Sequence, residues 1–370
     1  RGLGDVYKRQ VLQLIDHPYV QRLRRIRQLG LGYLVFPAAE HSRFSHALGA
    51  LELGQRVLNN LREKDTTISN QEYEGTLIAL LLHDVGQGPL SHTLEHSLLS
   101  EFNHEMMSLA IMHELNNQFD GALNTAIEIF TDQHPKKFLH QLVSSQLDLD
   151  RLDYLKRDSF FTGVSEGSVG IQRILKTMRV HKGNIVIERK GIYAIENYII
   201  SRRLMYMQVY LHKTVLSADS LIRSIFNRVS YLFANGEPLP SGSAQLDYFL
   251  REQPSAEKHI SSSVIEAYAH LDDYDVYQSI KAWQNVKDPI LSDLSHRFLN
   301  RNLFRASFFD KKPGKSTHQK IHELTRTYLD ENGLPNDDES MKYYIRTEYL
   351  SLIHISEPTR QAEMSYAVFC

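Results

Sequence analysis

The sequence has one cysteine and one tryptophan among 370 residues. A single thiol excludes both a disulfide framework and a zinc site built from several cysteines. No apolar run approaches the roughly 18 residues that a membrane-spanning helix needs, so we expect no membrane segment. Acidic and basic residues nearly balance, 44 against 42, which argues against a protein built mainly to coat nucleic acid or an anionic membrane. Because no signal peptide is recognisable, a cytoplasmic location is expected.

The remaining composition is that of a globular protein. Hydrophobic residues make up 42% of the chain and charged residues 23%, which excludes disordered and low-complexity classes. On a prior of roughly 150 residues per domain, the length fits two or three units or one interrupted helical domain. Eighteen histidines are present, and most histidines are surface imidazoles, so only their positions can indicate a function.

The two ends of the chain differ from the rest. Residues 1–10 (RGLGDVYKRQ) and 351–370 (SLIHISEPTRQAEMSYAVFC) resemble translated sequencing-adapter sequence. We interpret both segments as non-native, together with the lone Cys370, and place no functional residue in them.

Between these ends the pattern is mainly α-helical. The apolar run Leu77–Leu82 has no polar face and reads as a buried helix or strand, and the preceding Glu72 and Glu74 favour a helix. Gly86, together with Gly88 and Pro89, would end it. Further helices are predicted over 45–62, 92–117, 121–131, 136–145 and 148–157.

The second half contains one β signal. Alternating β-branched residues around Lys182-Gly183-Asn184 predict a small hairpin within 178–195. A long amphipathic helix or a pair of helices is expected over 196–231, and a loop over 236–242. We therefore divide the chain into a catalytic core (11–175), a hairpin with long helices (176–235) and a mainly helical C-terminal region (236–350).

Histidine and aspartate residues at three separated places form the strongest functional signal. They are His46 in HSRFSHALG, the pair His83-Asp84 in LLHDVGQGPLSH, and Asp150 in SSQLDLDRLDYLKRD. Two imidazoles and two carboxylates suit Mg²⁺, Mn²⁺, Fe or Zn²⁺. Neighbouring helix residues point about 100° apart, so His83 and Asp84 can share one ion only where the helix ends, and Gly86 and Gly88 end it just afterwards. Four protein ligands leave positions for water and a phosphoryl oxygen, as metal-assisted phosphoester hydrolysis requires.

In this setting the H…HD…D pattern resembles the HD superfamily of metal-dependent phosphohydrolases. The phrases IDHPYVQRLRRIRQLGLGYLVFPAAEHSRFSHALG, LLHDVGQGPLSHTLEH, FNHE and DLDRLDYLKRD are similar to its deoxynucleoside triphosphate triphosphohydrolase branch. That branch includes the SAM-and-HD-domain enzymes and the dGTPase-like enzymes, and the match covers roughly residues 14 to 235. The resemblance implies an HD-domain helical core, one divalent ion and a nucleotide substrate.

Histidines beyond the ligand set are candidates for proton transfer. His92 and Glu95 lie three residues apart on one helical face, where the carboxylate would orient the imidazole and raise its pKa. The resemblance gives the histidine at His92 the protonation of the leaving oxygen and places His104 near the reacting phosphate. A polar cap on a short helix is the alternative for both.

The resemblance also implies the substrate contacts. It assigns phosphate binding to Arg43 and Arg151, packing against the sugar to Tyr154, and the sugar 3′-hydroxyl to Asp158. A ring under C2′ would disfavour ribose. Gln28 and Leu29 match residues that touch the sugar, and we group Asp148 with these substrate-binding residues.

Regulation and assembly are implied as well. Asp16 and Arg24 match positions that read a guanine activator in relatives, and Arg22, Arg24, Arg25 and Arg27 form a basic cluster that captures phosphate or is simply a solvated face. Relatives build dimers and tetramers from the region after the hairpin, so a homodimer or homotetramer is expected.

The chain departs from the family pattern at three positions. Gln87 stands where a histidine is usual, Arg151 where lysine is common, and Glu95 where aspartate is common. The leading hypothesis is hydrolysis of deoxynucleoside triphosphates to deoxynucleoside and inorganic triphosphate. The alternatives are another HD phosphohydrolase, such as a 5′-nucleotidase or phosphodiesterase, and a nucleotide- or nucleic-acid-binding regulator with a weakened site.

Overall fold

The computed structural model describes residues 3–90, 103–252, 260–309, 313–351 and 363–369. The helices of the N-terminal half are α1 Leu3–Asp16, α2 Pro18–Gln21, α3 Arg43–Arg62, α4 Asn70–Leu82, α6 His104–Gln118, α7 Asn124–Phe130, α8 Lys137–Val143, α9 Leu149–Thr162 and α10 Ile171–Thr177. They are followed by strands β1 Met178–His181 and β2 Asn184–Ile187, and by α11 Ile192–Met205 and α12 Lys213–Ala234. The C-terminal elements are α13 Ala244–Glu252, α14 Ser262–Ala269, α15 Asp273–Trp283, α16 Pro289–Leu299, β3 Arg305–Phe309, α17 Lys315–Glu331, α18 Asp338–Met341, β4 Ile345–Ser351 and β5 Glu363–Phe369.

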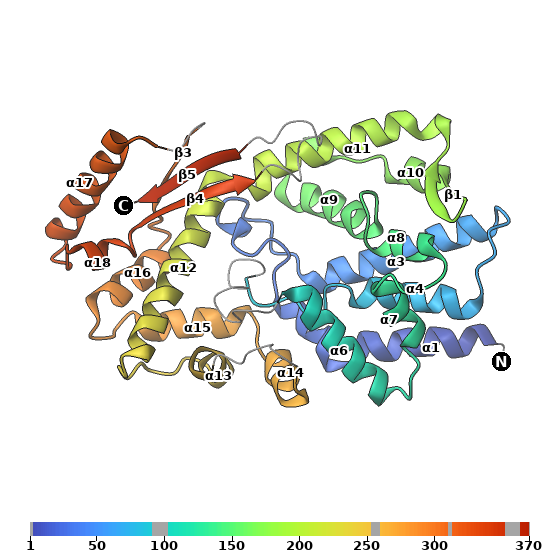
Figure 1. Ribbon diagram of the computed structural model, residues 1–370, viewed down its shortest axis with the longest axis horizontal. Helices are drawn as coiled ribbons and strands as arrows, with labels where there is room; N and C mark the ends of the chain where they lie inside the picture. Colours follow the sequence, from blue (N-terminus) through green and yellow to red (C-terminus); the bar gives the residue numbers. More distant parts are fainter. Residues whose placement is uncertain (1–2, 91–102, 253–259, 310–312, 352–362, 370) are drawn as a thin grey trace.

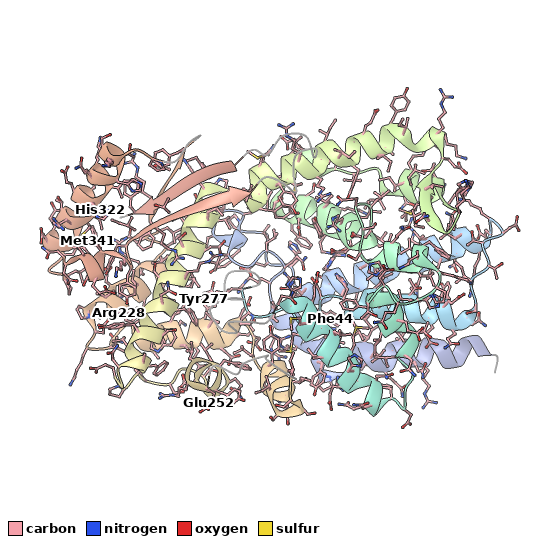
Figure 2. All side chains as sticks on the ribbon, in the orientation of Figure 1. Phe44, Arg228, Glu252, Tyr277, His322 and Met341 are labelled. Atoms are coloured by element: carbon pink, nitrogen blue, oxygen red, sulfur yellow. The ribbon has the colours of Figure 1, made fainter. Side chains whose placement is uncertain are left out.

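The mainly α fold class is confirmed. Figure 1 shows α1, α3, α4 and α6–α10 gathered in one half of the molecule, with α12–α18 and a small sheet in the other. Buried apolar side chains from Val11 to Tyr344 form one contiguous core. Tyr277, labelled in Figure 2, lies on α15. Its hydroxyl pairs with that of Tyr33 in the N-terminal half, so polar contacts also join the two halves.

Helix α4 is the central buried helix of the N-terminal half. A capping box between Ser69 and Glu72 starts it, because each residue binds a backbone N–H of the other. Leu77–Leu82 is at most 4% exposed, as expected for a helix packed on all sides. The apolar run is thus a helix rather than a strand, and it ends immediately before His83.

The predicted hairpin is present. β1 and β2 pair antiparallel from Met178↔Ile187 to His181↔Asn184. Lys182 and Gly183 both have positive φ angles, 49° and 78°, which is the backbone of a two-residue turn that matches the twist of the strands. The segment after it is a helix pair, because a π-helical stretch at Tyr206–Tyr210 and the break at Leu211–His212 separate α11 from α12.

Helix boundaries in the N-terminal half follow the predictions within a few residues, as for 121–131 and α7. The helix predicted over 92–117 is seen from His104 onward, and its first part lies outside the described residues. No helix of the described ranges is long and apolar enough to cross a membrane.

The C-terminal region holds a sheet that we did not predict. Three antiparallel strands lie in the order β3–β5–β4. The central strand, β5, belongs to the segment 351–370 that we interpreted as non-native, and residues 3–10 of the other such segment are part of α1. β3 lies far from β5 in sequence, and the eleven residues between β4 and β5 exceed the short turn of a recognisable hairpin, so local pattern did not reveal the pairing.

Candidate metal centre

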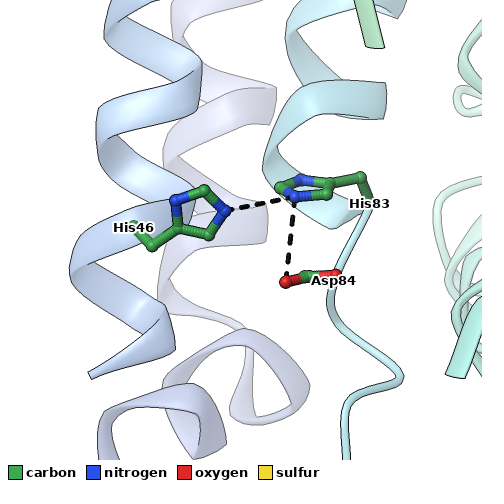
Figure 3. Close-up of side chains that lie close together, drawn as sticks. All are labelled: His46, His83 and Asp84. Atoms are coloured by element: carbon green, nitrogen blue, oxygen red, sulfur yellow. Dashed lines mark hydrogen bonds and ion pairs between the residues drawn. The ribbon is translucent and has the colours of Figure 1, made fainter. Parts of the chain in front are cut away.

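Side chains from three separate stretches meet beside the end of α4. His46 lies on α3, His83 caps α4 with Asp84 next to it, and Asp150 lies in the first turn of α9. The Nε2 atoms of His46 and His83 are 3.3 Å apart (Figure 3). Ligand atoms of His46, His83 and Asp84 all lie within 4.8 Å of one another. Asp150 Oδ1 is 3.1 Å from the Nε2 atom of His46 and 3.5 Å from that of His83.

The second nitrogen of each imidazole is already used. His83 Nδ1 donates to the backbone oxygen of Leu80 at 2.7 Å, and His46 Nδ1 donates to Asp153 Oδ2 at 2.8 Å. When a cation displaces the Nε2 proton, each Nε2 atom therefore offers a lone pair, and the two atoms face the same space. Orientation by a carbonyl or a carboxylate behind the ring is the usual arrangement of metal-binding histidines. The residues present thus fit a divalent cation.

The charges around this space are strongly coupled. Burial alone would lower the pKa of His46, but hydrogen bonds to Asp150 and Asp153 outweigh it and raise that pKa to about 10. Burial would raise the pKa of Asp84, yet the Arg43 guanidinium and His83 hold it at about 2. The carboxyl groups are therefore ionised at neutral pH, as cation binding requires.

The start of α9 sets the position of Asp150. Asp148 is the N-cap of this helix, and its Oδ1 accepts from the backbone N–H of Arg151 at 2.8 Å while Oδ2 accepts from that of Ser145 at 2.9 Å. Asp148 is fully buried and also pairs with the Arg151 side chain. Asp148 therefore positions the first turn of α9, and its grouping with the substrate-binding residues stays a prediction.

Residues outside the motif hold the loop after His83. Tyr268 of α14 donates to Gly86 O at 2.9 Å, and Ser108 of α6 donates to His83 O at 2.9 Å and accepts from Gly86 N–H at 2.9 Å. Asp273 of α15 accepts from the Leu90 N–H at 2.8 Å. The sequence left the role of the C-terminal region open. In the structure this region stabilises the loop after His83 through side-chain hydrogen bonds to its backbone.

Arg22 also stabilises this loop and links it to the C-terminal region. It is 1% exposed and donates to the backbone oxygens of Leu271 at 2.7 Å, Gln87 at 2.8 Å and Val85 at 3.3 Å. Neither interpretation of the arginine cluster holds for Arg22, because a side chain bound to three carbonyl groups is neither solvated nor free for phosphate. Its partners are up to 249 residues away, so the sequence carried no signal for this role.

The predicted phosphate-binding arginines are engaged within the protein. Arg43 is buried and donates to Asp84, while Arg151 NH1 donates to Ser145 O at 2.7 Å as well as to Asp148. Both guanidinium groups lie next to the metal centre. That of Arg43 contacts Asp84, a candidate metal ligand, and Arg151 lies in the first turn of α9 beside Asp150. Arg24 and Asp16 are exposed, and Arg24 donates to Gln21 Oε1 at 2.7 Å.

The predicted sugar-binding residues lie one to two turns further along α9. The ring of Tyr154 is 6.5 Å from that of His46 and 6.0 Å from that of Tyr210. Asp158 is clamped by His41 Nε2 and the Tyr210 hydroxyl, each at 2.7 Å.

A small cavity of about 150 Å³ adjoins this group, lined by Gln28, Leu29, Leu90 and Tyr210 among others. Gln28 Oε1 has no hydrogen-bond partner in the described chain. Tyr210 lies in no short motif, and His41 opens the phrase HSRFSHALG without a pattern of its own, so the sequence indicated neither residue.

His104 begins α6, and its backbone oxygen packs against Gly86. Gln87 is buried and takes the place of the usual histidine in the braced loop. His92 and Glu95 lie outside the described residues.

The chain is similar to known proteins over most of its length. Residues 169–232 match the family of the HD-associated region. The uncharacterized Bacillus subtilis protein YwfO is 35% identical over 321 residues, which cover 85% of this chain and 72% of that protein. The deoxynucleoside triphosphate triphosphohydrolase SAMHD1 homolog of Dictyostelium discoideum is 26% identical, and the match covers 80% of this chain and 56% of that protein.

The chain is also similar to a solved structure. The crystal structure of a phosphohydrolase from Bacteroides thetaiotaomicron superposes with a TM-score of 0.90 and 37% identity, covering 97% of this chain and 95% of that one. Together with the His46, His83, Asp84 and Asp150 cluster, these similarities place the chain in the HD-domain phosphohydrolase superfamily.

Proposed function

We propose that this protein hydrolyses deoxynucleoside triphosphates to deoxynucleoside and inorganic triphosphate. The observation that carries the proposal is that α9 bears Asp150 at the metal centre and, one and two turns later, Tyr154 and Asp158, which both contact Tyr210 in the wall of a small cavity. The same helix would therefore carry both a metal ligand next to the phosphate and the side chains that contact the sugar. The SAMHD1 homolog supports the substrate class.

His46, His83, Asp84 and Asp150 would hold one divalent ion, Mg²⁺, Mn²⁺, Fe or Zn²⁺. When bound, the ion supplies Lewis acidity toward a phosphoryl oxygen and water. Asp153 and the Leu80 carbonyl keep the two Nε2 atoms free for it. Arg43 keeps Asp84 ionised and adds positive charge where the α-phosphate would lie.

In the proposed reaction, water adds across the bond between the α-phosphorus and the 5′-oxygen. The oxygen of water becomes part of triphosphate, and a proton goes to the departing 5′-oxygen. His92, oriented by Glu95, would give that proton, and His104 would contact the phosphate. Arg151 would offset polyphosphate charge after its guanidinium turns from Asp148.

The sugar would lie against the Tyr154 ring, with its 3′-hydroxyl directed to Asp158. Burial raises the pKa of Tyr154 well above its ordinary value, so its hydroxyl stays neutral. Gln28 and Leu29 would close the other side of the sugar. A 2′-hydroxyl packed against an aromatic face would lack a partner, which favours deoxyribose.

We also propose a homo-oligomer and a regulatory nucleotide. Apolar side chains on one side of α11 point into solvent, with Tyr193 80% exposed and Ile199 and Ile200 58% and 59% exposed. Phe160 of α9 is 79% exposed as well. Such a patch is typical of a subunit contact. A guanine nucleotide near the exposed Asp16 and Arg24 is the proposed activator.

The experiment that tests the proposal is incubation of the purified chain with Mg²⁺ or Mn²⁺ and separate panels of deoxynucleoside triphosphates, ribonucleoside triphosphates and monophosphates. Chromatography should resolve deoxynucleoside and triphosphate as products, and Asp150→Ala should abolish their formation. Hydrolysis of monophosphates instead would indicate a 5′-nucleotidase. Bound metal without turnover on any nucleotide would indicate a regulator.

A further inference from the structure

A second cavity lies away from the metal centre, between α1, α3 and α4. It encloses about 410 Å³, the size of a small-molecule site. Its walls are mostly apolar, formed by Val11, Ile15, Leu51, Tyr73 and Leu77. Glu74 also lines it, and nine residues of helix, about 13.5 Å, separate Glu74 from His83.

The carboxyl group of Glu74 has no hydrogen-bond or ion-pair partner among the described residues. The side chain belongs to a residue that is 8% exposed, and its Oε1 atom is buried with no hydrogen bond to the described residues. A buried polar group without a hydrogen bond is costly, so nearly all such groups in folded proteins are paired.

The cavity's own cation does not supply that partner. Arg62 donates through Nε to Ile68 O at 3.1 Å and through NH2 to Ser69 O at 2.8 Å and Asn70 Oδ1 at 3.2 Å. Its guanidinium also lies over the Tyr73 ring, 4.4 Å from the centroid. These contacts hold Arg62 against the end of α3 and the start of α4.

We propose that this cavity binds a small amphiphilic amine, with its ammonium group on Glu74 and its apolar body between Val11, Leu51 and Leu77. A protonated amine supplies the hydrogen-bond donor and the charge that Glu74 lacks, and an alkyl or aryl body fits the apolar walls. An alcohol offers a weaker, uncharged donor, and a carboxylate would be repelled.

The test compares n-hexylamine with 1-hexanol and hexanoate by isothermal titration calorimetry on the full chain at pH 8. Hexylamine should bind at least about tenfold more tightly than hexanol, because hydrogen bonds to a charged group are the stronger ones. Glu74→Gln should remove this preference and leave hexanol binding unchanged.

A second variant keeps the test independent of Glu74. Leu77→Phe places a larger side chain in the cavity wall and should weaken hexylamine binding, while circular dichroism and metal content show that the fold is kept. The proposal is overturned if hexylamine fails to saturate by about 10 mM, if hexanol binds as tightly, or if either variant binds hexylamine like the parent chain.

Discussion

The side chain of Asp153 decides which nitrogen of His46 faces the metal centre. It accepts from His46 Nδ1 at 2.8 Å and from Arg157 Nε at 2.8 Å, so the ring and the carboxylate orient each other. Asp153→Asn keeps the shape but removes the charge that fixes the imidazole. We expect Mn²⁺ affinity, measured by calorimetry, to fall about 10- to 100-fold.

Asp338→Asn is the matched control for this variant. Asp338 has a 91% exposed side chain on α18, so its loss should leave Mn²⁺ affinity unchanged. Equal affinity of the Asp153 variant and the parent chain would show that the carboxylate behind His46 does not orient it.

Glu74 makes stability depend on pH. Burial raises its pKa from 4.5 to about 7, so the folded state holds a proton that the unfolded state has already lost between these pH values. Glu74 therefore weakens the fold as pH rises from about 4.5 to 7, and the loss is complete above 7. Glu74→Gln should be more stable than the parent by about 1–3 kcal/mol at pH 8 and nearly equal near pH 4.5.

Urea unfolding at both pH values checks this prediction. The carboxyl group that weakens the fold is the one to which we assign the amine, and binding groups often carry such a cost. A constant difference between the two proteins at both pH values would contradict the raised pKa.

The loop that follows His83 depends on a close approach at Gly86. A Cβ atom there would lie 2.5 Å from His104 O and 2.7 Å from Met107 C, which are backbone atoms of α6 that cannot turn aside. Gly86→Ala should push α6 from the loop, cost about 2–4 kcal/mol of stability and weaken metal binding. Thermal unfolding and metal content measure the two effects.

Gly170→Ala is the control, because a Cβ atom at Gly170 meets nothing within 4 Å. Its stability should stay within about 0.5 kcal/mol of the parent. If Gly86→Ala behaves in the same way, the close packing of loop and helix has no energetic role.

Local signals explain which elements were predictable. The signals for α4 lie within a window of twenty residues, which contains its capping residues, its apolar run and the glycines that follow it. The two turn residues of the hairpin are adjacent in sequence. The pairing of β3 with β5 and the contacts of Arg22 join segments that the chain separates widely, so no short window of sequence contains both partners. For the same reason, the motif indicated His46, His83, Asp84 and Asp150 but not Tyr268 or Asp273.

The protein is expected to form a homodimer or a homotetramer. The subunit contact would use the exposed apolar side chains Tyr193, Ile199 and Ile200 of α11 and Phe160 of α9. A charge on this patch would face apolar side chains of the second copy. Ile199→Glu should therefore convert the oligomer to a monomer in light scattering with nucleotide present.

The control places the same charge on another exposed apolar residue, Leu324 of α17, which is 44% exposed. Leu324→Glu should remain oligomeric. A parent chain that is monomeric with nucleotide would contradict the proposed assembly.

The convergence of three distant chain segments on one cation is tested most directly by anomalous diffraction from crystals soaked in Mn²⁺. We predict one strong peak about 2.0–2.3 Å from the Nε2 atoms of His46 and His83 and from carboxylate oxygens of Asp84 and Asp150. A map with no peak among these four side chains, or with the manganese bound elsewhere, would contradict the account.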